Sequence, residues 1–172
     1  MTTDFALDRP ALYVGTYGKY AAGSIAGAWL CLEDYASRDE FLDAARALHS
    51  DEPDPELMFQ DFCDLPRSLY SEGAISEKVF EYLRLSEDER EIVAAYWGEV
   101  GEGEVEDALD AFMGRATSAA EWLDEFLENT GFFYGWSEIA QRYFDAEAYL
   151  RDMRGDVYFV ELGGEVLAFS AH

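Results

Sequence analysis

The feature that most constrains this chain is its charge: 12 Lys and Arg residues stand against 37 Asp and Glu residues among 172. The formal net charge of −25 opposes a compact state through self-repulsion. Nevertheless, 49% of the residues are hydrophobic and 16% are aromatic, unlike the composition of disordered acidic tails. The chain therefore has the material for an apolar core and must carry its excess carboxylates on the outside.

The residue pattern predicts an α+β fold, arranged as an elongated chain of small domains. Residues 1–64 form the expected N-terminal domain, a small antiparallel sheet plus a helix. Its first two strands are ALYVGTYGKY and GSIAGAWLCL, rich in aromatic and β-branched residues. Ser37 and Glu40 form a capping box that opens the helix, and residues 57–62 are the expected third strand.

Residues 65–103 are predicted to form a central helical domain, with a second capping box at Ser86 and Glu89. Residues 104–172 form the expected C-terminal domain of helices plus a β-hairpin or sheet. One amphipathic helix is expected over residues 104–113, with Phe112 and Met113 facing inward.

A third capping box, at Ser118 and Glu121, opens the next predicted helix, which ends at Gly131. One or two further helices are expected over residues 137–153. Two strands follow in VYFVELGGEVLAFS, joined by a turn at its paired glycines.

Rows of acids on the predicted helices are unusual because neighbouring like charges repel. An i,i+4 pair of carboxylates costs about 0.2–0.5 kcal/mol, and this arrangement recurs. The two acids of such a pair lie about 6 Å apart along the helix axis, comparable to successive phosphates of a nucleic-acid strand. Such rows predict a surface that imitates a phosphate backbone, formed by Glu87, Asp88, Glu91, Glu104, Glu106, Asp107, Asp110, Glu121, Asp124, Glu125 and Glu128.

Signals for enzyme chemistry are weak, so no catalytic residue, cofactor or metal ligand is predicted. The glycines of VGTYGKYAAG lack the phosphate-loop order and no helix start is expected after them, which favours strand bends or a hairpin turn. Cys31 and Cys63 lack CxxC spacing and are expected to be small buried hydrophobes. His49 and His172 have no recognisable catalytic partner and are expected at the surface.

No segment has the roughly 20 apolar residues of a membrane span, and the N-terminus MTTDFALDRP does not resemble a signal peptide. We therefore expect a cytoplasmic protein with no membrane partner.

Three segments, YVGTYGKYAAGSIAGAWLCLEDY, PELMFQDF and WLDEFLENTG, together with the later YFDAEAYLRDM, resemble the ArdA antirestriction family. This resemblance implies a curved, acidic homodimer of three small domains that mimics bent B-form DNA. It would occupy the DNA groove of Type I restriction-modification enzymes, on their methyltransferase core, inside a bacterial host. Such an inhibitor has no catalytic residues and does not itself bind nucleic acid.

Two questions stay open at the level of sequence. The C-terminal strands offer a dimer contact through an exposed edge, at Val157, Tyr158, Phe159 and Phe169, or they pair only within their own domain. The alternative function is a salt-adapted small acidic enzyme or a generic acidic interaction module, which the low Lys content and the pI near 4.1 also fit.

Overall fold

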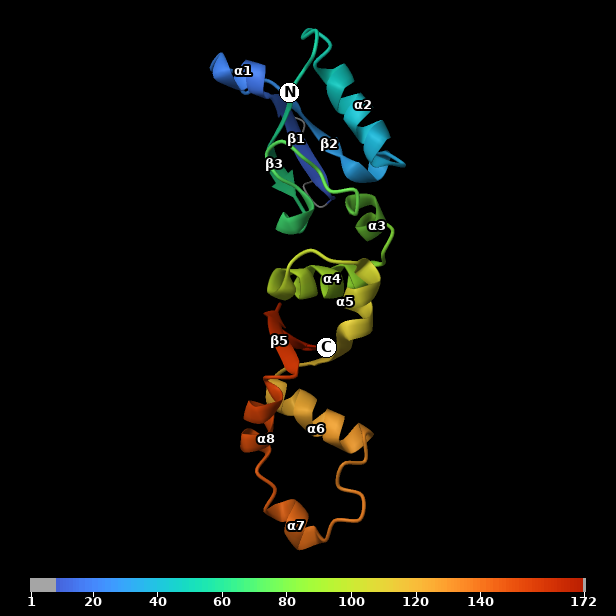
Figure 1. The fold of residues 1–172 in the computed structure, drawn as a ribbon, viewed down its shortest axis with the longest axis vertical. Coiled ribbons are helices and arrows are strands. Elements are labelled where there is room, and N and C mark those ends of the chain that lie inside the picture. Colours follow the sequence, from blue (N-terminus) through green and yellow to red (C-terminus); the bar gives the residue numbers. More distant parts are fainter. Residues whose placement is uncertain (1–8, 172) are drawn as a thin grey trace. The chain divides into compact units, whose positions relative to one another are not determined.

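The computed structural model describes residues 9–171, and contacts within the chain divide it into two compact units (Figure 1). The N-terminal unit ends at Arg90 and the C-terminal unit begins at Glu91. Each unit is built on a three-stranded antiparallel sheet accompanied by helices, which confirms the predicted α+β class. The division into three domains, with boundaries after residues 64 and 103, stays a prediction.

The N-terminal unit has a sheet with the strand order β2-β1-β3, and helix α2 lies along one face of it (Figure 1). The predicted pairing of the first two strands and the predicted third strand are confirmed. Its elements are β1 (Ala11–Thr16), α1 (Tyr17–Ala21), β2 (Ala28–Cys31), α2 (Arg38–Leu48), β3 (Leu57–Cys63) and α3 (Val79–Leu83), followed by the first turn of α4 (Glu87–Val100).

Helix α1 corrects the expectation that no helix start follows the first strand. The Thr16 side chain caps it by accepting a hydrogen bond from the Lys19 N–H (3.1 Å). Gly23 ends it with a φ of +80°, as the Gly23 N–H donates to the Tyr20 carbonyl and the Ser24 N–H to the Lys19 carbonyl. This is a Schellman motif, so Gly23 terminates a helix and is not a strand bend.

Helix α2 begins where the first capping box predicts, with Ser37 Oγ accepting from the Glu40 N–H (3.2 Å). Its inner face holds Phe41, which is fully buried and lies 6.1 Å from the Phe59 ring of β3, measured between centroids. The buried residues Leu12 and Val14 of β1 complete this apolar layer. Burial of these side chains is the main force that joins helix and sheet.

His49 corrects the prediction of a surface histidine, because it is only 1% exposed. Its Nε2 lies 3.1 Å from the Val14 carbonyl oxygen, so this nitrogen carries the proton and donates. Its Nδ1 then accepts from Lys19 Nζ at 2.8 Å, and Lys19 also pairs with Asp51 (2.9 Å). The histidine therefore ties α2 to β1 and α1. The second histidine, His172, lies outside the described residues.

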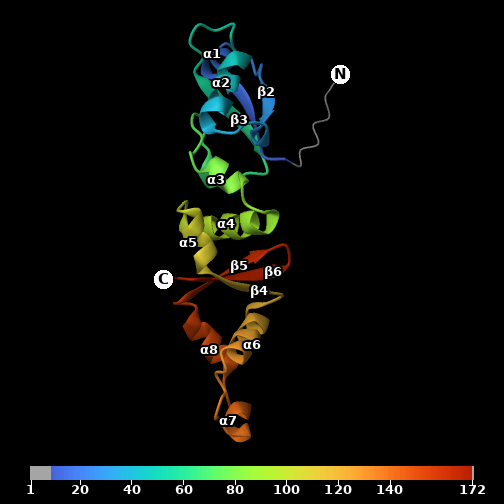
Figure 2. The same cartoon turned by 90° about the vertical axis from the view of Figure 1, so that its right-hand side faces the viewer.

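The C-terminal unit is a three-layer structure around the sheet β4-β6-β5 (Figure 2). The predicted hairpin is confirmed, with positive φ at both Gly163 and Gly164. The one or two helices predicted over residues 137–153 are present as two short helices. Besides α4, the elements are α5 (Val105–Ala111), β4 (Phe112–Ala116), α6 (Ala119–Asn129), α7 (Glu138–Arg142), α8 (Ala146–Met153), β5 (Val157–Leu162) and β6 (Glu165–Ser170).

The central strand β6 is buried on both faces. Successive side chains of a strand point to opposite faces of the sheet, so β6 contributes to two apolar layers. Leu167 and Phe169 pack against α4 and α5, whereas Ala168 packs in a cluster with Trp122 and Leu127 of α6. The helix pairs α4–α5 and α6–α8 consequently cover opposite faces of this sheet (Figure 2). A strand that is buried on both faces has a continuous run of apolar residues, and residues 166–169 (VLAF) form such a run.

Strand β4 corrects the prediction of a helix that continues to Met113. The helix ends at Ala111, and Phe112 instead pairs with Phe169 of β6. The register shifts just after Phe112, and Gly114 adopts a φ of +134°, which other residues rarely do. Met113 is exposed, contrary to its expected inward position. Pairing with a strand more than 50 residues away thus overrides the local helical pattern.

Of the two cysteines, only Cys31 is buried as the sequence predicted. Neither cysteine forms a disulfide with another described residue, and Cys63 is half-buried. Burial raises the pKa of the Cys31 thiol, which keeps it protonated. Among residues 9–171, no helix combines the length and hydropathy that crossing a bilayer requires.

Phe169→Ala should destabilise the C-terminal unit by about 3–5 kcal/mol, because it opens a cavity beneath a fully buried ring. That ring contacts Tyr96 at 5.4 Å and Phe112 at 5.7 Å between centroids. Urea unfolding followed by circular dichroism measures the loss. Tyr134→Ala, at a side chain that is 94% exposed, is the matched control and should change little; equal losses for both would contradict this packing.

Candidate acidic interaction surface

All eleven acids predicted to form the mimic surface are exposed in the structure. Glu87 and Asp88 lie in the first turn of α4, at the end of the N-terminal unit. The other nine belong to the C-terminal unit, which has 18 acidic residues against four arginines and no lysine. This unit therefore has few cations of its own to neutralise its surface. These nine are Glu91, Glu104, Glu106, Asp107, Asp110, Glu121, Asp124, Glu125 and Glu128.

Helix α6 separates apolar and acidic side chains most sharply. Trp122, Leu123 and Leu127 are buried, and the Trp122 ring stacks on Phe126 with 5.0 Å between centroids. Amphipathic spacing consequently turns the acids of the helix toward solvent. The helix ends at Gly131 with φ +64°, as the sequence predicts, so the acidic row has a defined length.

The start of α6 fixes one of these carboxylates. Ser118 Oγ accepts from the Glu121 N–H (3.1 Å), and the Glu121 carboxylate accepts from the Thr117 N–H (2.8 Å) and from the Thr117 hydroxyl. These hydrogen bonds from Thr117 lower the pKa of Glu121. A capping box therefore holds a charged group in place at the helix end that favours anions.

The same arrangement recurs at the start of α4. The Glu89 carboxylate accepts from the Ser86 N–H (2.9 Å) and the Ser86 hydroxyl (2.8 Å), which lowers the pKa of Glu89. This capping box was predicted from the sequence, but Glu89 was not among the predicted surface acids. The capping pattern itself was the signal for it.

Arg115 is a feature that sequence analysis missed. From β4 it reaches Glu91 of α4 (3.0 Å) and Glu165 of β6 (3.3 Å). It therefore neutralises one predicted mimic residue, Glu91, within the unit. No local pattern could have revealed this, because the partners lie 24 and 50 residues away in sequence.

On α5 and α6, six of the predicted acids have no ion pair or side-chain hydrogen bond with any other described residue. They lie on two helices, α5 and α6, where nothing but water and ions screens them. We call them the six unpaired acids: Glu106, Asp107, Asp110, Asp124, Glu125 and Glu128.

The predicted dimer contact is distributed over two strands with different surroundings. Val157 and Phe169 are buried, and Tyr158 and Phe159 are half-buried against the helices of their own unit. Phe169 lies on the central strand, whose two edges are both paired. Of these two strands only β5 lies at an edge of the sheet, so its backbone offers a pairing edge, as the backbone of β4 does at the opposite edge.

The chemistry available to this surface is electrostatic. Among residues 9–171, no group of three His, Cys, Asp or Glu side chains is arranged to hold a metal ion. His49 is buried in a structural network. A surface dense in carboxylates attracts positively charged macromolecular surfaces and steers their approach. The fold and the surface thus define an acidic α+β protein with a strongly charged exterior.

A model of the antirestriction protein ArdA matches residues 12–166. The chain therefore belongs to the ArdA antirestriction family, a family of non-catalytic inhibitors that act on restriction-modification enzymes. Comparison with curated proteins gave no match.

Glu121→Gln should remove a pH-dependent part of the stability. Because the folded-state pKa is lowered, the carboxylate stabilises the protein above its unfolded-state pKa, about 4.3. That contribution is lost as the pH falls through the lower folded-state value. Denaturation of wild type and variant between pH 2 and 7 should show curves that differ at pH 7 and converge in acid. Glu125→Gln controls for loss of a charge on the same helix; a gap that persists at pH 2 would contradict the prediction.

Proposed function

We propose that this protein is a DNA mimic that occupies the DNA-binding groove of Type I restriction-modification enzymes and so prevents DNA from binding. The observation that carries the proposal is the surface formed by the six unpaired acids on α5 and α6. In the groove, Lys and Arg side chains of the enzyme that otherwise contact phosphates would meet these carboxylates. Family membership supports the class of target, and the charge pattern supports the mechanism.

The amount of charge is sufficient for this role. Duplex DNA carries one negative charge per about 1.7 Å of axis, so a net charge of 25 corresponds to about 40 Å of duplex. The carboxylates carry no base-sequence information. Contacts to DNA phosphates likewise position a protein on the duplex without reading its base sequence. A mimic of this kind competes with any DNA target of the enzyme.

Charge of this kind acts collectively, so single and multiple neutralisations should differ in effect. An exposed ion pair is worth about 0.2–1 kcal/mol; one Glu→Gln change should weaken inhibition less than about fivefold. Changing all six unpaired acids to their amides should weaken it at least tenfold. Displacement of a labelled duplex from a purified Type I methyltransferase measures both.

The matched control removes six charges from the N-terminal unit instead, which gives the same net charge. Equal loss in both variants would show that total charge, not the C-terminal surface, is what the enzyme recognises. A single substitution that abolishes inhibition of a folded protein would contradict collective action. The control positions are all exposed and are Asp39, Asp54, Glu56, Asp61, Glu72 and Glu81.

The dependence of inhibition on salt concentration distinguishes DNA mimicry from a salt-adapted enzyme or a generic acidic module. Inhibition should fade between roughly 50 and 200 mM salt, as phosphate-dependent DNA binding does. No displacement at either salt concentration, with the protein shown to be folded by circular dichroism, would favour a salt-adapted enzyme or a generic acidic module.

We further propose that the protein acts as a homodimer, joined through the C-terminal unit. The free backbone edge of β5 supports this contact, because an exposed strand edge readily pairs with another strand. Sedimentation velocity over a hundredfold range of concentration should show a species of twice the 19.4 kDa chain mass. A monomer throughout that range would contradict the proposed dimer. The duplex-displacement assay would still test the charge mechanism separately.

A further inference from the structure

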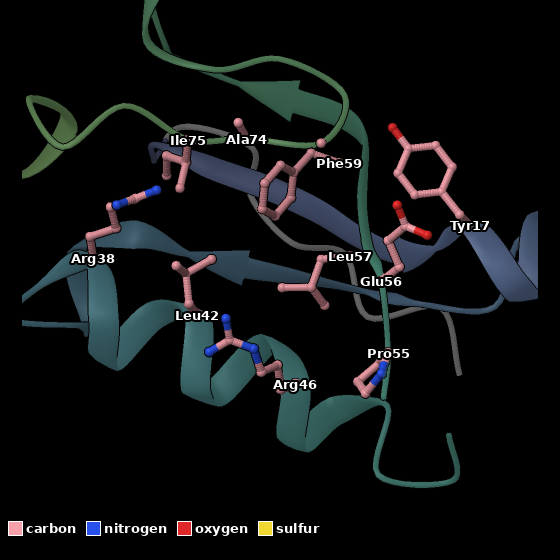
Figure 3. Close-up of a pocket in the computed structure, with 11 residues that line it drawn as sticks. Tyr17, Arg38, Leu42, Arg46, Pro55, Glu56, Leu57, Phe59, Ala74 and Ile75 are labelled. Carbon is pink, nitrogen blue, oxygen red and sulfur yellow. The ribbon is translucent and has the colours of Figure 1, made fainter. Parts of the chain in front are cut away.

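A pocket in the N-terminal unit stands apart from the acidic surface and has different chemistry. It lies between α2, the first half of β3 and the loop that contains Ala74 and Ile75 (Figure 3). Its volume is about 400 Å³, within the range of small-molecule sites. The proposed mimicry, which rests on the acids of α5 and α6, does not involve it.

The inner part of the pocket is apolar. Phe59 and Ile75 are 4% and 3% exposed and form its base, while Leu42 and Leu57 extend into it from α2 and β3 (Figure 3). These side chains can cover the hydrocarbon body of a ligand. An apolar cavity of this kind gains affinity by removing such a body from water.

Two arginines border this apolar base, in a chain that has only 12 cationic residues. Arg38 and Arg46 are eight residues apart on α2, so they lie on the same face about 12 Å apart along the axis, with Leu42 between them. In Figure 3 the side chains of Leu42 and Arg46 both rise from α2 toward β3.

The acidic partners of these arginines are weakly held. Arg38 pairs with Glu77 (3.1 Å) and Arg46 with Asp43 (3.3 Å), but the acidic side chains are 85% and 80% exposed. Exposed ion pairs of this kind are worth little, so a ligand can replace them. Moreover, Arg38 Nε is buried and no acceptor among the described residues reaches it. A buried donor without an acceptor is costly, and a ligand that reorients this guanidinium can satisfy it.

We propose that this pocket binds a small carboxylic acid with an apolar body. The body would lie on Leu42, Leu57 and Phe59, and the carboxylate would accept charge-assisted hydrogen bonds from Arg38 and Arg46. The net charge of the unit opposes such binding, since it contains 19 acidic residues against eight basic ones. The overall charge of the unit therefore cannot attract an anion to the pocket, and an anion that binds here must be held by local contacts with the arginines.

The test is a titration of the ¹⁵N-labelled full chain with 4-phenylbutyrate, followed by ¹H–¹⁵N correlation spectra at constant ionic strength. The uncharged 4-phenylbutyramide is the matched ligand. We expect saturable shifts of the Leu42, Leu57 and Ala74 amides with the acid, and binding at least tenfold weaker with the amide. The Arg38→Gln/Arg46→Gln variant should bind the acid more weakly than the wild type by a similar factor. Arg142→Gln, an exposed arginine of α7, is the control and should bind normally.

Three outcomes would overturn the proposal. They are the absence of saturable shifts at the pocket, equal affinity for acid and amide in the wild-type protein, and unchanged affinity in the double arginine variant. The acid–amide comparison needs no substitution, so the proposal can fail even if the double variant does not fold. Inhibition of restriction plays no part in the readout.

Discussion

The structure depends on burying enough apolar surface to withstand self-repulsion between carboxylates. The C-terminal unit does so by covering both faces of a three-stranded sheet with helices. Its central strand contributes Leu167 and Phe169 to one layer and Ala168 to the other. Because each helix uses one face for this core, its opposite face is left to carry the acids. The packing that stabilises the unit therefore also produces the charged surface.

Helix capping links local stability to charge in both units. Ser37, Ser86 and Ser118 each accept a hydrogen bond from the N–H of a glutamate three residues later. At the last two of these helix starts, the glutamate also accepts hydrogen bonds that lower its pKa. The carboxylate thereby lies at the positive end of the helix dipole. Some of the acidic excess thus stabilises the fold, while the six unpaired acids contribute only to the surface field.

The fold was predictable wherever local pattern and tertiary environment agree. The capping boxes, Gly131 and the Gly163–Gly164 turn predicted their elements well, since these signals act within a few residues. The failures lie where distant contacts decide. Phe112 and Met113 continue a helical pattern but join β6 in a sheet, and His49 looks like a surface residue but bonds to the Val14 carbonyl of β1. The pocket beside α2 could not be predicted either, because residues from four separated segments line it.

By itself, the sequence determined the class of the fold, the acidity of the surface and the family, because composition, capping and motif order are local properties of the chain. Only the tertiary structure decided which carboxylates are neutralised. Arg115 pairs with Glu91 and Glu165, and the acids of α5 and α6 have no such partner within the described residues. Ion pairing depends on distances of a few ångströms between residues far apart in sequence, and folding alone sets those distances.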